Sequence, residues 1–105
     1  MAPEYIQAPG KSAVEELDQR VEPPRRFRVL MHNDNYTTMD FVVVMLRSIF
    51  KRSPGDAERI MLNIHIGGIG VCGVYPAEIA ETKIEEVHGR ARERGFPLRC
   101  SMEPE

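Results

Sequence analysis

Prolines and glycines break this chain into short segments, and their positions limit where each helix and strand can begin and end. Ser53 followed by Pro54 is typical of the cap and first position of a helix. Gly95, with Pro97 just after it, is typical of a helix end. The pattern therefore predicts several short elements, and the sequence contains no internal repeat.

A pair of prolines, Pro23 and Pro24, separates two parts of different composition. The part before them is polar and has few large apolar residues, so it cannot bury enough surface to offset the entropy lost on ordering. We therefore expect residues 1–24 to form a flexible N-terminal tail. Residues 25–105 are long enough for one small core and are expected to form a single domain.

Within that domain the hydrophobic pattern predicts the order strand, helix, helix, strand, helix, strand. The expected elements are a strand over residues 26–31, a helix from Thr37 or Thr38 to Phe50, a helix beginning at Ser53, a strand over residues 68–75, a helix from Pro76 to Gly95 and a strand over residues 98–102. Because strands that follow one another tend to pair, we expect a small antiparallel sheet covered by helices, an α/β fold of the α+β type.

The inward faces of two helices can also be predicted. The first helix is apolar almost all round, which indicates burial on more than one face. The third helix is expected to face inward with Ile79, Ile84, Val87 and Ala91.

Charge and cysteine usage narrow the class of protein. The net charge is −2 with acids and bases interspersed, which indicates neither a nucleic-acid partner nor a membrane surface. No apolar run is long enough for a membrane span, and the first residues lack the apolar core of a secretion signal, so we expect a cytoplasmic protein. Cys72 and Cys100 stand alone among apolar neighbours and are expected to be buried free thiols.

Three patterns suggest chemistry but fit it poorly. The segment GIGVCG, residues 68–73, matches a dinucleotide-binding glycine pattern, yet it follows an expected helix and lies within an expected strand. We interpret its glycines as thinning the strand beside a neighbouring backbone. His32, Asp34 and His65 carry metal-binding groups at a spacing that fits no common site, so no metal or cofactor is expected. A cysteine or serine nucleophile would need a general base and an oxyanion hole, and the sequence suggests neither.

The segment HNDNYT, residues 32–37, places several hydrogen-bonding side chains between two apolar runs. Asn and Asp often bond to nearby backbone, so the residue types alone favour a polar turn followed by a helix cap. A ligand site is the alternative, because such groups also suit the rim of an apolar hole.

Four blocks carry a resemblance to a known family, namely RVLMHNDNYTTMDFVV, IMLNIH, GVCGVYPAEIAETKI and FPLRC. In order and spacing, from Phe27 to Met102, they resemble the ClpS family, the adaptors of Clp ATP-dependent proteases. The resemblance implies a three-stranded antiparallel sheet against three helices, and an adaptor that is not an enzyme. It also implies binding of proteins whose N-terminal residue is Phe, Tyr, Trp or Leu, and their delivery to the N-terminal domain of a ClpA-like unfoldase.

The resemblance also implies roles for individual positions. The positions matched to the site for the substrate's α-amino group and first peptide group are Asn33, Asp34, Asn35, Thr37 and His65. The positions matched to the side-chain pocket are Met39, Val42, Met61, Ile64 and Leu98, and those matched to unfoldase docking are Glu78 and Lys83. Three positions depart from the usual pattern: Asn35 stands where Asp is usual, Thr38 where Pro is frequent, and Ile64 where Val is common.

Elementary chemistry is compatible with such a site. Amide oxygens and a neutral imidazole can accept hydrogen bonds from an ammonium, and an Asn amide can donate to a carbonyl. Helical spacing puts Met61 and His65 on one stripe, so that one element would supply both wall and rim. Two alternatives stay open: a domain that docks on a Clp-type partner but has lost recognition of the terminal residue, and a hydrolase using His65 and Asp34.

Overall fold

The computed structural model describes residues 22–105 of the chain. Its elements are β1 (Arg26–His32), α2 (Met39–Ser48), α3 (Pro54–Gly67), β2 (Ile69–Pro76), α4 (Ala77–Arg94) and β3 (Arg99–Pro104), which confirms the predicted order. The expected flexible tail falls largely on residues 1–21, outside the described residues, and residues 22–25 have no regular secondary structure.

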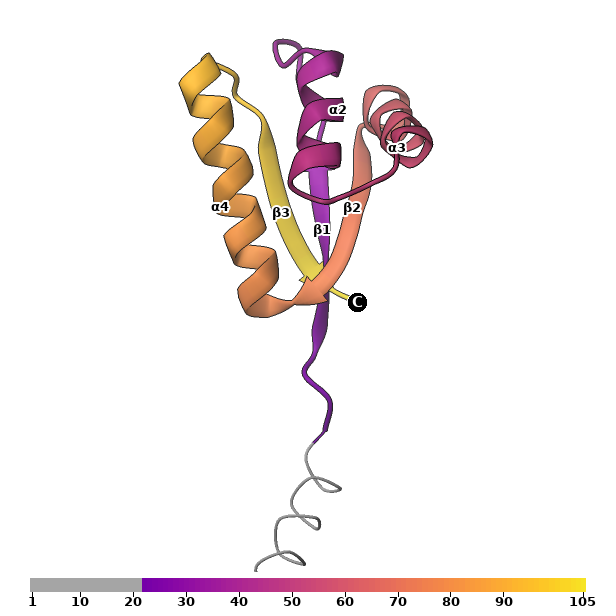
Figure 1. The fold of residues 1–105 in the computed structure, drawn as a ribbon, viewed down its shortest axis with the longest axis vertical. Helices are drawn as coiled ribbons and strands as arrows, with labels where there is room; N and C mark the ends of the chain where they lie inside the picture. Colours follow the sequence, from indigo (N-terminus) through magenta and orange to yellow (C-terminus); the bar gives the residue numbers. More distant parts are fainter. Residues whose placement is uncertain (1–21) are drawn as a thin grey trace, which may run out of the picture.

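The strands form one antiparallel sheet in the order β2-β1-β3, with β1 at its centre (Figure 1). The expected pairing of successive strands holds for β1 and β2 but not for β2 and β3, because β3 returns to the other edge of β1. The fold is therefore the predicted α+β type.

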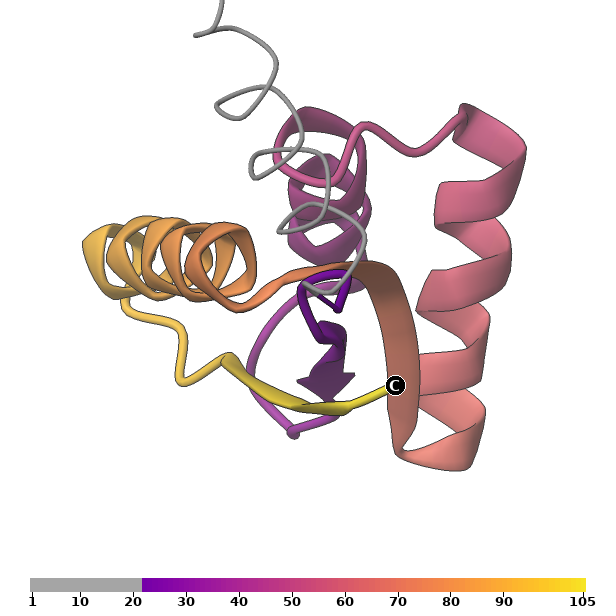
Figure 2. The same cartoon turned by 90° about the horizontal axis from the view of Figure 1, so that it is seen from below.

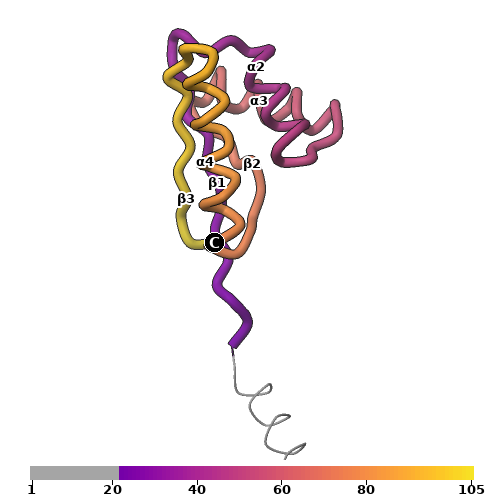
Figure 3. Tube along the Cα trace, turned by 60° about the vertical axis from the view of Figure 1, so that its left-hand side comes forward, coloured from indigo at the N-terminus to yellow at the C-terminus, as the bar shows by residue number. Residues whose placement is uncertain are grey.

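The helices lie on one face of the sheet (Figure 2). Val29 and Met31 of β1 point to this face and are fully buried, whereas their neighbours along the strand are half-buried. Helix α4 packs against all three strands, and α3 packs against β2 and α2. In Figure 3, α4 runs alongside the sheet while α2 and α3 gather toward one end of it.

Local capping fixes the helix boundaries close to where the sequence predicts them. Of the two candidate N-caps for α2, Thr38 is used, and its Oγ1 accepts from the Phe41 N–H at 3.1 Å. Ser53 caps α3 in the same way, with Pro54 at the first helical position. Gly95 ends α4 in the left-handed region at φ 77°, a conformation that glycine adopts without strain.

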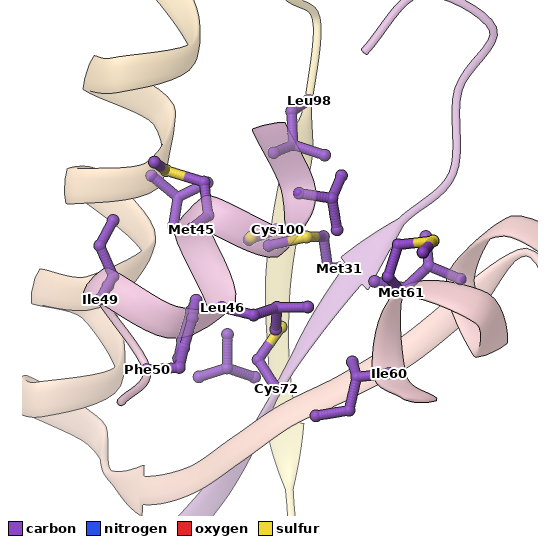
Figure 4. Packing of buried hydrophobic residues seen from close by; sticks show 14 of the residues in the cluster. Met31, Met45, Leu46, Ile49, Phe50, Ile60, Met61, Cys72, Leu98 and Cys100 are labelled. Atoms are coloured by element: carbon purple, nitrogen blue, oxygen red, sulfur yellow. The ribbon is translucent and has the colours of Figure 1, made fainter. Parts of the chain in front are cut away.

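The core lies between the helices and the sheet (Figure 4). Met45 of α2 and Ile49, the residue that follows this helix, extend toward α4, and Met61 lies on the α3 side. Cys72 and Cys100 are buried free thiols, as predicted, and burial raises the pKa of Cys100 to about 12.

Of the glycines of GIGVCG, Gly68 is the C-cap of α3 and Gly73 lies in the middle of β2, whereas Gly70 lies near the start of β2 beside α3. A Cβ added there would lie 2.7 Å from Cγ1 of Ile64 and 3.2 Å from the carbonyl oxygen of Ile60. The absence of a side chain therefore lets β2 approach α3 closely, which confirms the interpretation of a thinned strand.

One prediction about an inward face was wrong, and another held except on one side of its helix. Ile79 is 47% exposed, and Ala80 takes the buried position, because α4 docks with a stripe that begins one residue later. Helix α2 is buried over a broad arc that includes Phe41, Met45 and Leu46, as expected, but Val44 on its remaining side is 52% exposed. Val44 lies on a side of α2 that also carries the exposed Asp40 and Arg47. No helix within residues 22–105 is long and apolar enough to cross a membrane.

Candidate functional site

A cavity of about 580 Å³ opens where the chain passes from β1 into α2, opposite α3. Nine of the ten predicted binding residues line it: Asn33, Asp34, Asn35, Thr37, Met39, Val42, Met61, Ile64 and His65. It is also lined by Tyr36, Thr38 and Asp40, which the resemblance did not assign to binding. These three lie between assigned residues in the sequence, and this adjacency is the feature from which their place in the cavity could have been predicted.

The position of the cavity follows from how the turn is anchored. The N–H of Asn33 donates to the carbonyl of Gly68 at 2.9 Å, which fixes the end of β1 to the junction between α3 and β2. Thr38 then begins α2 a few residues later. The turn is therefore held at both ends beside the last turns of α3, from which His65 projects.

Asp34 organises the turn from within. Its carboxylate accepts from the N–H of Tyr36 at 2.8 Å, from the N–H of Thr37 at 2.7 Å and from the hydroxyl of Thr37 at 2.8 Å. Desolvation by burial is the largest single influence and raises the pKa of Asp34, but the hydrogen bonds from Thr37 and Tyr36 together outweigh it and lower the pKa. Asp34 and Thr37 therefore serve the turn, as the polar-turn interpretation predicted.

The other three residues that the resemblance matched to binding of the substrate's terminus are different. Asn33, Asn35 and His65 are exposed, and their side chains make no hydrogen bond to another residue in the range 22–105. Within the described residues their acceptors and amide donors are therefore unoccupied at the lining of the cavity, where a ligand could bond to them.

The wall of the cavity is apolar and comes from two helices. Val42 of α2 and Met61 and Ile64 of α3 are buried, whereas Met39 in the first turn of α2 is 46% exposed and lies at the mouth. Met61 and His65 are four residues apart on α3, so the expected combination of wall and rim on one helix is present. The arrangement suits a ligand with one apolar side chain and a polar group beside it.

Leu98 is the predicted pocket residue that the structure does not bring to this cavity. It is 5% exposed and lies just before β3, where it borders a separate shallow depression with Phe96 and Arg99. Its side chain packs into the core instead, as Figure 4 shows.

The residues considered for a metal do not converge. The His32 Nε2 atom is 2.7 Å from the Ser101 hydroxyl, and desolvation together with nearby Arg99 lowers the pKa of His32. The Asp34 carboxylate is occupied by the turn. Within residues 22–105 no group of three His, Cys, Asp or Glu side chains gathers in a way that would hold a metal ion.

The two predicted docking residues lie on α4, away from the cavity. Helix α4 begins at the end of the domain opposite the turn (Figure 1). Glu78 is exposed in its first turn. Lys83 is tied to the domain, because its Nζ donates to the Ile49 carbonyl at 2.8 Å and lies 5.2 Å from the centre of the Tyr75 ring.

Comparisons with known proteins agree with this geometry. Residues 22–101 match the family described as ATP-dependent Clp protease adaptor protein ClpS. The ATP-dependent Clp protease adapter protein ClpS of Oleidesulfovibrio alaskensis is 63% identical over 83% of this chain and 84% of its own. The ClpS of Desulfatibacillum aliphaticivorans is 61% identical over 86% of both chains.

A solved structure shows the same fold. It is that of Agrobacterium tumefaciens ClpS2 bound to L-phenylalaninamide. The ClpS2 sequence is 38% identical to this chain, the TM-score is 0.75, and the match covers 79% of this chain and 100% of the ClpS2 chain. Together with the family match over residues 22–101, this likeness shows that the chain belongs to the ClpS family of adaptor proteins of the ATP-dependent Clp protease.

Proposed function

We propose that this adaptor binds proteins by a bulky apolar N-terminal residue and delivers them to a Clp unfoldase. The observation that carries the proposal is a cavity whose wall is apolar and whose rim holds three side chains that form no hydrogen bond with another residue of the described range 22–105, Asn33, Asn35 and His65. A chain terminus presents the matching groups, namely a side chain, an ammonium and one peptide unit.

The solved relative supports this match through the chemistry of its ligand. L-phenylalaninamide, bound by the ClpS2 of Agrobacterium tumefaciens, has a free α-amino group, an amide in place of the first peptide bond and an aromatic side chain. Burial of an aromatic or leucine side chain contributes about 1.5–3 kcal/mol, which alone would give weak binding. Hydrogen bonds from the ammonium to the rim are therefore expected to supply much of the affinity.

Delivery needs a second surface. Glu78, near the start of α4, is free to contact a partner while the cavity at the other end is occupied. A ClpA-like unfoldase, docked through its N-terminal domain and working in the cytoplasm, is the partner we expect.

The test is a titration of labelled peptides that differ only in their first residue. A Phe-first peptide should bind, and an Arg-first peptide and an N-acetylated Phe-first peptide should not. Equal binding of the acetylated peptide would overturn the proposal, and failure of all three peptides alongside intact unfoldase binding would favour the docking-only alternative.

A matched pair of variants tests whether the rim residue Asn33 contacts the peptide. Asn33→Ala should weaken Phe-first binding by at least about tenfold, because a hydrogen bond to a charged group contributes about 1.5–3 kcal/mol. Its backbone bond to Gly68 remains, so the turn should keep its anchor. Asn63→Ala, an exposed asparagine of α3 that does not line the cavity, should leave affinity unchanged.

A further inference from the structure

A groove of about 480 Å³, here called the edge groove, lies between α3 and the start of β2. Seven uncharged residues line it, among them Leu62, Asn63, Ile66, Ile69, Gly70 and Val71. Helical spacing puts its α3 residues on the face opposite Met61 and His65, which line the cavity. The edge groove shares no lining residue with the cavity, so a ligand in one leaves the other free.

The strand that borders the edge groove lacks the features that protect a sheet edge. Within residues 22–105, β2 pairs only with β1, so its other side is a free edge. The opposite edge strand, β3, carries Arg99, Glu103 and Pro104, and charged residues and proline hinder the pairing of an edge with another chain. Residues 69–73 of β2 contain neither charge nor proline, and Ile69 and Val71 are 43% and 41% exposed. β2 is therefore the edge that is open to a further strand.

Hydrogen-bonding groups of the β2 backbone are directed toward this edge. The Asn33 N–H donates to the Gly68 carbonyl, and bonded pairs of an antiparallel ladder recur at every second residue. The backbone groups of Ile69 and Val71, which lie between bonded pairs, therefore point away from β1. Unpaired groups of this kind form a template for an extended chain.

The open part of the edge is short. Directly after Val71, the Cys72 carbonyl already accepts a hydrogen bond from Nε of Arg52 at 2.9 Å, which closes the edge to a further strand. Residues 69–71 span about 10 Å at about 3.3 Å per residue. The open edge therefore accommodates about three residues of an extended chain.

We propose that the edge groove binds a short extended segment of another protein, which adds as a strand to β2. In this mode of recognition the main chain provides affinity and alternate side chains provide specificity. Leu62 and Ile66 are 43% and 80% exposed on the α3 side, so aliphatic side chains of the segment would cover them. Because the lining has no charge to pair with a charged side chain, the segment is expected to be uncharged.

The size of the edge groove favours a peptide segment over a folded partner or a second copy of the chain. A stable interface between folded proteins uses about 20–30 residues on each side, whereas seven line the edge groove. Strand addition needs no free N-terminus, so the segment can be internal to its chain. The adaptor would thereby hold a partner by an internal segment while the cavity remains free for a chain terminus.

The probe for this surface is the peptide acetyl-Thr-Val-Thr-Val-Thr-amide, which lacks the free ammonium that a ligand of the cavity is proposed to need. Added to the isotope-labelled full chain, it should shift the NMR amide signals of residues 69–71 and leave those of Asn35 and Thr37 unchanged. A peptide with Pro as its central residue loses an N–H donor and should bind about fivefold more weakly. Replacing both Val residues of the probe by Glu should abolish binding.

Matched variants assign the contact to the edge groove. Ile66→Ser should weaken probe binding about fivefold, because partial burial of one aliphatic side chain is lost. Val71→Lys should weaken it at least as much, since a charged residue on an edge strand opposes pairing. Val44→Ser changes an exposed valine of α2 outside the edge groove and should leave the affinity unchanged. If Val71→Lys does not fold, Ile66→Ser and the Pro peptide still decide the question.

Three results would overturn the inference: signal shifts confined to the cavity, an equal loss of affinity in Ile66→Ser and Val44→Ser, or equal binding of the Pro peptide. Two further results would assign the edge groove to another occupant and so overturn it as well. One is a dimer in sedimentation that Val71→Lys dissociates, and the other is a gain of about tenfold in probe affinity on removal of residues 1–22. None of these outcomes bears on the cavity, whose proposed function is tested separately with Phe-first peptides.

Discussion

Asp34→Ala should destabilise the turn that carries the rim, because this carboxylate accepts three hydrogen bonds of 2.7–2.8 Å. Hydrogen bonds to charged groups contribute about 1.5–3 kcal/mol each. The sum of three such bonds exceeds the expected loss of stability, because at an exposed turn water would bond to the N–H groups that Asp34 leaves. Tyr36, one of the donors, is 76% exposed. We therefore expect a loss of about 2 kcal/mol in the free energy of unfolding, comparable with removal of a strong helix cap.

The same change should weaken ligand binding without removing a ligand contact. A loosened turn must be ordered again when a substrate binds between Asn33 and Asn35, which costs up to about 2 kcal/mol, or about thirtyfold in the dissociation constant. Urea unfolding followed by circular dichroism gives the stability, and titration of a labelled Phe-first peptide gives the affinity.

Two further variants separate a turn role from direct contact with the substrate. Asp34→Asn keeps an oxygen that can accept the two backbone bonds, so it should be milder than Asp34→Ala in both assays. Thr37→Val removes the hydroxyl donor alone and should cost less than either. A drop in affinity for Asp34→Asn as large as that for Asp34→Ala, with stability unchanged, would refute the reasoning and indicate that the charge itself meets the ammonium.

The pH dependence of stability gives an independent check. The pKa of Asp34 lies below its ordinary value of 3.8 in the folded protein, so the folded state binds the proton less well than the unfolded state does. The stabilisation is therefore present above about pH 3.8 and is lost as the pH falls through the lowered folded pKa. The stability difference between wild type and Asp34→Asn should shrink over that acid range and stay constant from pH 5 to 7, as urea unfolding at several pH values would measure.

Four other changes test the remaining roles. Met39→Ala should admit Ile- and Val-first peptides, because the thioether at the mouth no longer crowds side chains branched at Cβ; their continued exclusion in a titration where Phe-first peptide binds normally would show that Met39 is not the gate. Asn35→Asp should tighten Phe-first binding about fivefold at low salt, since a charge-assisted bond replaces a neutral one, and an unchanged or weaker affinity would argue against contact with the amine. Glu78→Ala should weaken capture by the unfoldase in a pull-down with the melting temperature unchanged, whereas Lys83→Ala should lower the melting temperature too, because its ammonium is bonded to a carbonyl at the end of α2. Removal of residues 1–22 should leave peptide affinity intact and slow degradation of bound substrate; full-rate delivery by the shortened chain would rule out a role for this segment.

Features that depend on a few neighbouring residues were predictable from the sequence. Thr38, Ser53 and Gly95 act on backbone groups within about one helical turn, so their residue types suffice to locate the helix ends. The strand partners were less predictable, since β3 pairs with β1 across most of the chain. Ile79 was placed wrongly because the inward face of α4 depends on how the helix docks on the sheet, which its own sequence determines only to within one residue.

In the candidate site, too, some features are predictable from the local sequence and others are not, here at the scale of single side chains. Asn33, Asp34 and Asn35 are chemically similar neighbours, and their residue types fit a turn and a ligand site equally well. The structure separates them by their hydrogen bonds: the carboxylate of Asp34 accepts from the N–H groups of Tyr36 and Thr37, whereas the side chains of Asn33 and Asn35 bond to no other residue in the range 22–105. A site of this kind needs a fixed turn as well as amides that can bond a ligand. If the turn were not held in place, the entropy lost on ordering it would weaken binding. Under the proposed function we therefore expect both interpretations to hold for alternate residues: the hydrogen bonds of Asp34 fix the turn, and the flanking amides of Asn33 and Asn35 bind the incoming ammonium.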